Sequence, residues 1–328
     1  MNIVPPHYND GNRAFLQAFL ARGTLTFEEA QIILAEIFTI EAEDGEPVVA
    51  EQVTQQDFES FLEAAAEAVS FFDYEIRGTV HQVSKKRVYA LVNTASDPMT
   101  QLATTYNTEQ IAFTKRLLDA MFDTYNSPRM ELMCITEMQA IKLARPPRQQ
   151  NNNHNDVDED GAPTQTQSSA DKGLKHSEVE DMLRNLVNQG WLEKSRNGFY
   201  SLSPRALLEL RAWLIDSYND PDAAAQEWQR IKFCEACKGI VTVGQRCAER
   251  DCNARIHHIC SDAYWRTQRS HKCPRCSRDW DGEHYIGEEA ETSTEAYKRG
   301  RRRSGGRKSN VPDEDVHENG GDEDEDEA

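Results

Sequence analysis

CEACKGIVTVGQRCAERDCNARIHHICSDAYWRTQRSHKCPRC, residues 234–276, is the stretch that decides how this part of the chain folds. It holds seven of the chain's eight cysteines, which together with one histidine follow the order C-C-C-C-H-C-C-C. Thiolates and imidazoles are the ligands of tetrahedral structural zinc, which takes four. The stretch therefore predicts two structural zinc ions. The predicted ligands are Cys234, Cys237, Cys247, Cys252, His257, Cys260, Cys273 and Cys276.

The ligand spacing allows two pairings. Sequential pairing would give two adjacent zinc beads, whereas interleaved pairing gives the cross-brace of RING-type domains. The gap of four residues between Cys252 and His257 is too short for independent beads and favours the cross-brace. The first predicted site is Cys234, Cys237, His257 and Cys260, and the second is Cys247, Cys252, Cys273 and Cys276.

His258 competes with His257 for one ligand position. Only His257 leaves two residues before Cys260, as the other close ligand pairs do, so His257 is the predicted ligand. Four protein ligands fill each site and leave no position for a catalytic water, so no catalytic residue is predicted. Zinc removal is expected to unfold the segment. Reduced cysteines without metal are the disfavoured alternative.

Length and charge bound the rest of the molecule. A chain of 328 residues has room for two or three domains. It has no apolar run of membrane-spanning length and no N-terminal leader, so we expect a soluble protein that is neither secreted nor in a membrane. Residues 1–233 carry 21 Lys and Arg against 35 Asp and Glu. This acidity favours protein over nucleic acid as a partner, because phosphate contacts need basic side chains.

Residues 1–104 have the pattern of a winged-helix domain. Apolar residues recur at helical spacing in three segments, and two alternating segments joined by a polar turn then predict a β-hairpin. The predicted helices are Arg13–Leu20, Thr26–Phe38 and Val53–Phe72, and the predicted strands are Tyr74–Gln82 and Val88–Asn93.

The same order recurs, more weakly, over residues 105–220, which predicts a second winged helix. An insert at 145–172 is rich in Gln, Asn, Asp, Ser and Thr, and we expect it to be disordered. The predicted elements are helices Glu109–Tyr125, Glu131–Leu143 and His176–Gly190, strands Trp191–Lys194 and Phe199–Leu202, and a long helix Pro204–Tyr218.

The predicted fold class is therefore α+β, with tandem winged-helix domains followed by a small cross-brace, two-zinc RING-like domain at 230–286 and a disordered, charged tail at 287–328. Within the tail, Lys298–Lys308 is basic and Asp313–Glu327 is acidic. The basic block fits a nuclear import signal or a nucleic-acid contact, and equally a solvated linker.

Two classes of domain share this ligand order: PHD fingers, which read histone tails, and RING-type ubiquitin ligases. His271 stands where PHD fingers usually have Trp, whereas Pro274 follows the seventh ligand as in many ligases. Ser277 stands where an activating Arg is often found, which lowers the expected activity. The residues predicted to dock a conjugating enzyme are Ala236, Ile240, Tyr264, Trp265 and Pro274.

Over residues 10–285 the chain resembles the non-SMC element one family, the variant-RING subunit of the Smc five–six complex, and we expect a fungal member. The resemblance rests on several motifs together, each weak alone. They are RAFLQAFLARGTL (Arg13–Leu25), VYALVNTASDPMTQLAT (Val88–Thr104), GFYSLSPRALLEL (Gly198–Leu210), RIHHIC, and CPRCSRDW with its Trp280.

The resemblance implies tandem winged helices followed by a variant RING. It implies a RING-type E3 ubiquitin-protein transferase whose activity is weak or partner-dependent, in the nucleus, in DNA repair and recombination. The implied partners are a MAGE-type non-SMC element three subunit, a kleisin non-SMC element four subunit and a ubiquitin-conjugating enzyme. Direct nucleic-acid contact is left open. The alternatives are a non-enzymatic subunit whose RING-like domain stabilises assembly and, more distantly, a histone reader.

Overall fold

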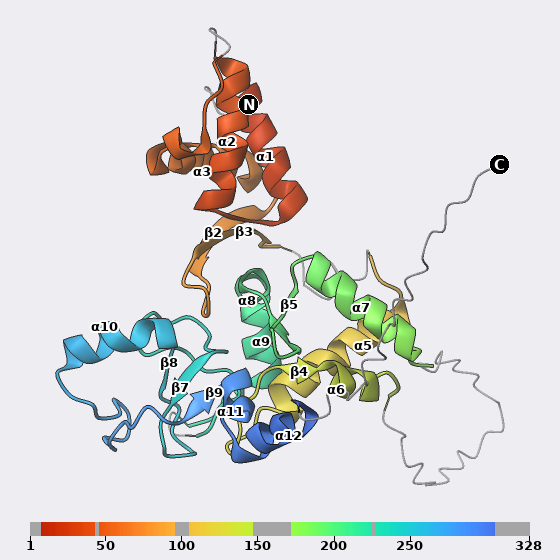
Figure 1. Ribbon diagram of the computed structural model, residues 1–328, viewed down its shortest axis with the longest axis vertical. Helices are drawn as coiled ribbons and strands as arrows, with labels where there is room; N and C mark the ends of the chain where they lie inside the picture. Colours follow the sequence, from red (N-terminus) through yellow and green to blue (C-terminus); the bar gives the residue numbers. More distant parts are fainter. Residues whose placement is uncertain (1–7, 43–45, 96–104, 147–171, 225–226, 306–328) are drawn as a thin grey trace, which may run out of the picture. The chain divides into compact units, whose positions relative to one another are not determined.

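The computed structural model describes residues 8–42, 46–95, 105–146, 172–224 and 227–305 (Figure 1). The chain divides into two compact units, Met1–Glu291 and Thr292–Ala328. The first unit contains an N-terminal module, a second helical module and the cysteine-rich region.

The N-terminal module packs three helices against a three-stranded sheet. The sheet has strand order β1-β3-β2, with both pairings antiparallel. The sequence pattern predicts neither β1 nor η1 of this module, because three residues are too few to show a period. The elements are α1 (Asp10–Arg22), β1 (Thr24–Thr26), α2 (Phe27–Glu41), η1 (Ala50–Gln52), α3 (Gln55–Ser70), β2 (Tyr74–Val80) and β3 (Arg87–Asn93).

Local signals set the ends of these helices. The Thr26 side chain accepts a hydrogen bond from the backbone N–H of Glu29, and the Glu29 carboxylate accepts one from the backbone N–H of Thr26, which forms a capping box at the start of α2. α1 ends at Gly23, whose φ of 71° is left-handed and suits glycine. Aromatic rings centred on Phe15 and Phe58 fill the core of this module.

The second module follows the predicted order of helices and strands. Its short sheet has the order β4-β6-β5. Residues 147–171 of the predicted disordered insert lie outside the described residues. The elements are α5 (Thr108–Asp119), η2 (Ala120–Thr124), β4 (Ile135–Thr136), α6 (Glu137–Lys142), α7 (His176–Asn188), β5 (Leu192–Lys194), β6 (Phe199–Leu202), α8 (Pro204–Glu209) and α9 (Arg211–Tyr218).

Two predicted helices of this module differ in the structure. The helix predicted over Glu131–Leu143 begins only at Glu137, after its capping residue Thr136. The residues before it are buried and not helical, and Met133 has a left-handed φ of 45°. The long helix predicted over Pro204–Tyr218 is broken at Leu210, where ψ is 1° and the backbone leaves the helical range.

The cysteine-rich region folds around a third small sheet, of order β8-β7-β9. A Cβ atom at Gly244 in β7 would overlap the carbonyl oxygen of Ile256 in β8, so only glycine allows the two strands to come this close. The elements are β7 (Gly244–Arg246), β8 (Arg255–Ile256), α10 (His258–Gln268), β9 (Tyr285–Ile286) and α11 (Glu288–Thr292).

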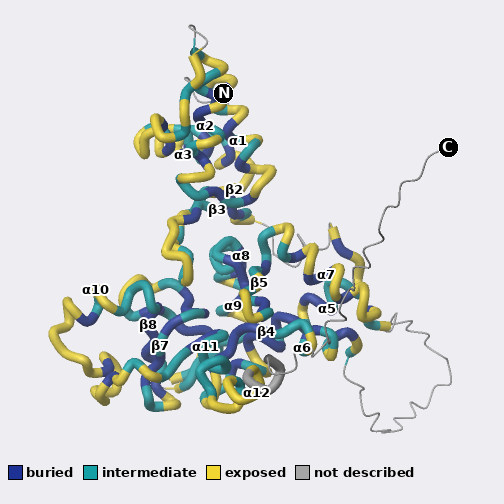
Figure 2. Tube along the Cα trace, in the orientation of Figure 1, coloured by how far each residue is buried: buried dark blue, intermediate teal, exposed yellow. Residues whose placement is uncertain are grey.

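One hydrophobic core runs through both the second module and the cysteine-rich region. It includes Phe113 and Met182 of the helical module together with Ile256 and Trp265 of the metal-binding region. The N-terminal module has a separate core. Figure 2 shows buried segments in both the second module and the cysteine-rich region. The cysteine-rich region is therefore built into the second module.

In the second unit, α12 (Glu295–Gly305) is helical, although the tail from residue 287 is predicted to be disordered. Its first turn contains Glu295, which pairs with Lys298 at 3.7 Å. The acidic segment Asp313–Glu327 lies outside the described residues.

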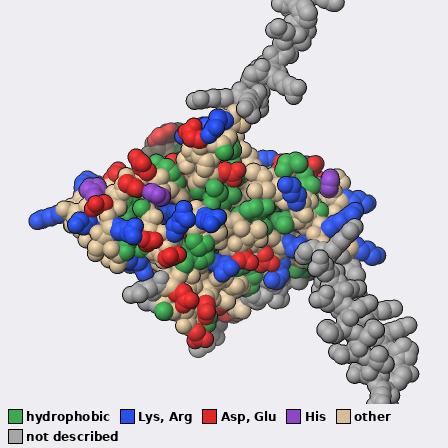
Figure 3. All heavy atoms as spheres, turned by 90° about the horizontal axis from the view of Figure 1, so that it is seen from below, with side chains coloured by type: hydrophobic (Ala, Val, Ile, Leu, Met, Phe, Trp, Pro, Cys, Tyr) green, Lys and Arg blue, Asp and Glu red, His purple; other side chains and the backbone are tan. Residues whose placement is uncertain are grey.

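On the face drawn in Figure 3, Lys and Arg are interspersed with Asp and Glu. Among the described residues, no helix is both long and apolar enough to cross a membrane.

Candidate metal centre

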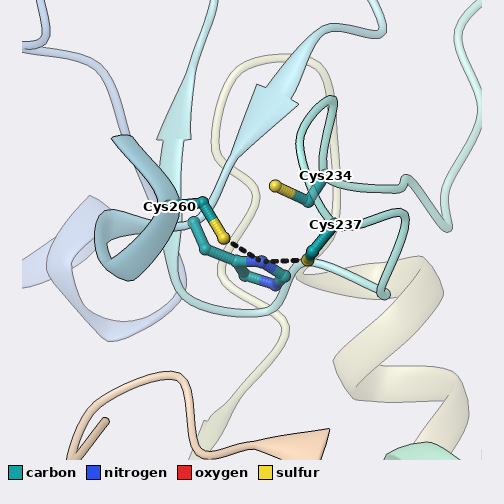
Figure 4. Close-up of side chains that lie close together, drawn as sticks. Cys234, Cys237 and Cys260 are labelled. Carbon is teal, nitrogen blue, oxygen red and sulfur yellow. Dashed lines mark hydrogen bonds between the residues drawn. The ribbon is translucent and has the colours of Figure 1, made fainter. Parts of the chain in front are cut away.

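The first predicted ligand set converges in space. The ligand atoms of Cys234, Cys237, His257 and Cys260 all lie within 4.8 Å of one another. His257 ends the segment after β8 and is the N-cap residue of α10, so Cys260 falls in the first turn of that helix. The Nδ1 atom of His257 lies 3.3 Å from the Sγ of Cys237 and 3.8 Å from that of Cys260. Figure 4 shows the three cysteine side chains pointing toward one another around the imidazole ring.

The second ligand set converges in the same way. Cys247, Cys252, Cys273 and Cys276 also have their sulfur atoms within 4.8 Å of one another. The Sγ atoms of Cys247 and Cys276 are 3.5 Å apart, and those of Cys252 and Cys273 are 3.6 Å apart. Two ligands from before β8 thus join two from after α10, which is the interleaved, cross-braced arrangement.

These separations fit zinc. Tetrahedral zinc with bonds of about 2.3 Å to sulfur and about 2.0 Å to nitrogen places its ligand atoms about 3.5–3.8 Å apart. All the cysteines are free thiols. The two clusters are therefore consistent with two zinc ions in which every coordination position is taken by protein, so the metal holds the fold together.

The choice of histidine is settled by geometry. His258 points elsewhere: its Nε2 atom lies 2.7 Å from a carboxylate oxygen of Glu289. The Nε2 atom of His257 lies 3.0 Å from the backbone oxygen of Ile240, so an N–H there donates to that oxygen and leaves Nδ1 for the metal. His257 is the ligand, as the spacing predicts.

Backbone turns hold two of the close cysteine pairs. The N–H of Lys238 donates to the oxygen of Cys234, and that of Ser277 donates to the oxygen of Cys273. Lys238 and Ser277 both have left-handed backbone angles, with φ of 61° and 59°. The two turns are thus built alike, each with the residue after its second cysteine in the left-handed region.

A buried carboxylate lies beside the metal-binding region. Glu131, in the extended segment before β4, is 1% exposed, and Arg255, between two metal ligands in β8, is 0% exposed. Nε of Arg255 donates to Glu131 at 2.7 Å, and its Nη2 also contacts that carboxylate. Lys232 donates to it at 3.2 Å and Arg246 lies 3.6 Å away. The sequence pattern gives no sign of this network, because it places Glu131 in a helix.

The pKa of Glu131 reflects these neighbours. Burial acts to raise it, but the hydrogen bonds and charge of Arg255, together with Lys232 and Arg246, outweigh burial and hold the pKa at about 2. Glu131 is therefore ionised at neutral pH. Its carboxylate joins the second module to the cysteine-rich region.

The five residues predicted to dock a conjugating enzyme divide into two groups. Ala236 and Pro274 are exposed and Tyr264 is half-buried. Ile240 and Trp265 are only 4% and 8% exposed. The Trp265 ring stacks on His271 at 5.3 Å between centroids and also packs against Trp280. Trp265 is therefore a core residue of the metal-binding region.

Arginines near the last ligands are engaged within the region. Arg275, between Cys273 and Cys276, pairs with Glu235, which lies between Cys234 and Cys237. Arg278 pairs with Glu249 at 2.7 Å. The Arg275 pair brings the first and last close cysteine pairs together, so exposed Ala236 and Pro274 lie on adjoining turns.

Comparison with known families gives two matches. Residues 12–210 match the family described as the Nse1 non-SMC component of the SMC5-6 complex. Residues 234–276 match a RING-like domain. The first match alone spans more than half of the chain.

Two relatives with related names align with most of the chain. The human "Non-structural maintenance of chromosomes element 1 homolog" is 23% identical over 274 residues, 84% of this chain and 85% of the human protein. The Schizosaccharomyces pombe protein is 24% identical over 66% of this chain and 74% of its own length. The expectation of a fungal member is not borne out, since vertebrate relatives match over a larger share of the chain.

A solved structure shares the fold. A chain of an "Nse1-Nse3-Nse4 complex" superposes with a TM-score of 0.60 at 20% identity, covering 83% of this chain and 97% of that chain.

Proposed function

Since the chain belongs to the family of Nse1 non-SMC components of the SMC5-6 complex, we propose that it is the RING-type ubiquitin-protein ligase subunit of that complex. The observation that carries the proposal is the pair of interleaved metal sites, with exposed Ala236 and Pro274 on adjoining turns. RING-type domains that dock a conjugating enzyme have interleaved metal sites of this kind, which supports the proposal. The enzyme class is E3 ubiquitin transferase.

Such a domain acts without a reacting group of its own. All eight ligands are needed for the metal sites, so catalysis consists of holding the charged conjugating enzyme and orienting its thioester toward a lysine. Tyr264 borders the docking face, whereas Ile240 and Trp265 support it from beneath. Ser277 follows the last ligand and both nearby arginines are paired, which supports a weak or partner-dependent activity.

The proposal extends to partners and place of action. In each helical module three α-helices precede the hairpin of a three-stranded antiparallel sheet, and we assign both modules to the winged-helix class. The net charge of −19 favours protein partners. We assign these partners as the MAGE-type Nse3 subunit and the kleisin Nse4 subunit, in the nucleus, in DNA repair and recombination. A chain of the solved Nse1-Nse3-Nse4 complex has a similar fold, which supports Nse3 and Nse4 as the partners.

A second candidate function has its own support. The metal-binding region shares a hydrophobic core with the second module and is joined to it by buried Glu131 and Arg255. A domain this integrated suits a non-enzymatic subunit whose RING-like region stabilises assembly.

Ubiquitin discharge from a panel of charged conjugating enzymes, with and without Nse3, separates the two functions. The ligase proposal expects discharge that Nse3 stimulates, and that Pro274→Ala and Ala236→Asp reduce about 10-fold or more while zinc content and co-purification with Nse3 stay unchanged. If the wild-type complex discharges ubiquitin from none of the conjugating enzymes, the ligase proposal fails and the non-enzymatic, structural function remains. Trp265 is unsuitable for this test because its replacement would disturb the core.

A further inference from the structure

The tip of the N-terminal hairpin, between β2 and β3, contacts the loop that follows the first two metal ligands. Gln82 provides this contact. Its Nε2 donates to the oxygen of Ile240 at 3.0 Å. Its Oε1 accepts from the backbone N–H groups of Thr242 and Val243 at 3.1 and 2.9 Å, and from the Thr242 hydroxyl at 3.3 Å. One side-chain amide thus makes four hydrogen bonds to residues 240–243.

The contacted loop is part of the surroundings of the first metal site. The oxygen of Ile240 that accepts from Gln82 also accepts from Nε2 of His257. That bond fixes the imidazole so that Nδ1 faces Cys237 and Cys260. Hydrogen bonds to the second nitrogen of a ligand histidine set its orientation and strengthen metal binding. Gln82 is thus one hydrogen bond removed from a ligand.

The loop depends on Gln82 because it is buried. Ile240, Val241 and Thr242 are all buried, and a buried backbone N–H that loses its acceptor destabilises the segment that carries it. The residue before Gln82 holds the hairpin tip in place, since Nε2 of His81 lies 3.1 Å from the carboxylate of Glu193 in β5. The tip is thus attached to the second module beside the point where it contacts the metal-site loop.

We propose that Gln82 is a positioning residue for the first metal site, through which the N-terminal module holds the Ile240–Val243 loop and, through that loop, His257. The N-terminal module then contributes to zinc retention in a domain more than 150 positions away along the chain. The inference concerns metal binding and stands whether or not the chain is a ligase.

Zinc release from the full-length, zinc-loaded protein tests the proposal. A chromogenic chelator is added to wild type, Gln82→Ala, Gln82→Met and the control Ser84→Ala, an exposed residue of the same turn. Gln82→Met keeps the length of the side chain and removes its hydrogen bonds, so it separates the loss of these bonds from the loss of side-chain volume in Gln82→Ala. Both Gln82 variants are expected to release one zinc equivalent about 10-fold faster, at the lower end of the effect of residues that support a ligand. The second zinc equivalent of the Gln82 variants should leave at the wild-type rate. Ser84→Ala should release both equivalents at the wild-type rate.

Hydrogen exchange supplies a readout that does not depend on metal. The amides of Thr242 and Val243 are expected to exchange faster in both Gln82 variants, while amides near Cys247 and Cys252 are unchanged. The proposal is overturned if each zinc equivalent leaves the Gln82 variants at the wild-type rate and the amides of Thr242 and Val243 exchange at the wild-type rate. Equally accelerated loss of both equivalents also overturns it, because that result indicates general destabilisation.

Discussion

At the scale of single residues, Glu131 is the side chain on which the junction between the second module and the metal-binding region depends. Replacing it by Gln leaves Arg255 buried and without its carboxylate. Breaking a buried pair in this way costs about 3–5 kcal/mol. We therefore expect Glu131→Gln to lower the thermal unfolding midpoint strongly in a differential scan.

The matched control is Glu137→Gln. Glu137 pairs with Lys194 at 3.1 Å, but both side chains are more than a third exposed. An exposed pair contributes about 0–1 kcal/mol, so this variant should unfold close to wild type. Equal unfolding midpoints for the two variants would show that the buried Glu131 pair stabilises the protein no more than the exposed Glu137 pair does.

His81 gives the hairpin tip a dependence on pH. Its hydrogen bond to Glu193 raises its pKa above the ordinary value of 6.5, against the opposite effect of burial. A group whose pKa is raised on folding stabilises the fold fully below its unfolded pKa, and this contribution is lost as pH rises through the folded value. The pair is partly exposed, so the contribution is about 1 kcal/mol or less. Wild type should therefore be more stable than His81→Gln at pH 6.

The measurement is denaturant unfolding of both proteins at pH 6.0 and pH 8.5. The difference in free energy of unfolding between them should shrink at the higher pH. The opposite trend would mean that His81 is neutral when paired with Glu193.

Individual residues differ in how far the sequence predicts them. The eight ligands are predictable because zinc chemistry restricts both residue type and spacing. Gln82 and Glu131 carry no such restriction, since their partners lie far along the chain and any polar residue fits a local pattern at these positions. Trp265 is in between: its type suggests a docking aromatic, and its burial beneath the metal sites is decided by tertiary packing.

At the scale of elements, long apolar periodicity predicts helices well, and short extended segments escape it. α7 and β6 agree closely with their predicted ranges, while β1 and β4 have too few residues to show a period. The break at Leu210 has no local signal, because neither Gly nor Pro stands there.

β7 and β8 supply the prediction at this scale. Gly244→Ala places a Cβ against the backbone oxygen of Ile256, which cannot move aside as a flexible side chain would. Overpacking of this kind costs about 1–3 kcal/mol. We expect a lower unfolding midpoint and faster zinc loss to a chelator. Gly300→Ala is the control, since a Cβ there meets nothing within 4 Å and lies away from both metal sites in sequence. If both variants retain zinc like wild type, β7 and β8 separate easily and the close approach does not matter.

At the scale of the molecule, the order of modules is readable from the sequence, and the way they share cores is not. The sequence treats the cysteine-rich region as a small domain that follows two others. In the structure, its apolar residues continue the core of the second module, and the N-terminal module keeps its own. Periodicity within a segment cannot reveal this sharing, because it shows which face is buried and not what covers it.

Removal of zinc tests the shared core. Each site collects four ligands that have no other reason to lie together, so the metal-binding region should lose its structure without zinc. Since buried Cys247 and Ile256 belong to the same core as Phe113 and Met182, unfolding should extend into the second module. In hydrogen exchange with a strong chelator and a reductant, amides of residues 106–146, 172–224 and 227–286 should lose protection, while α1 and α3 of the N-terminal module keep theirs. Added zinc should restore protection. Loss confined to 234–286 would instead show an independently folding metal domain that rests against a stable neighbour.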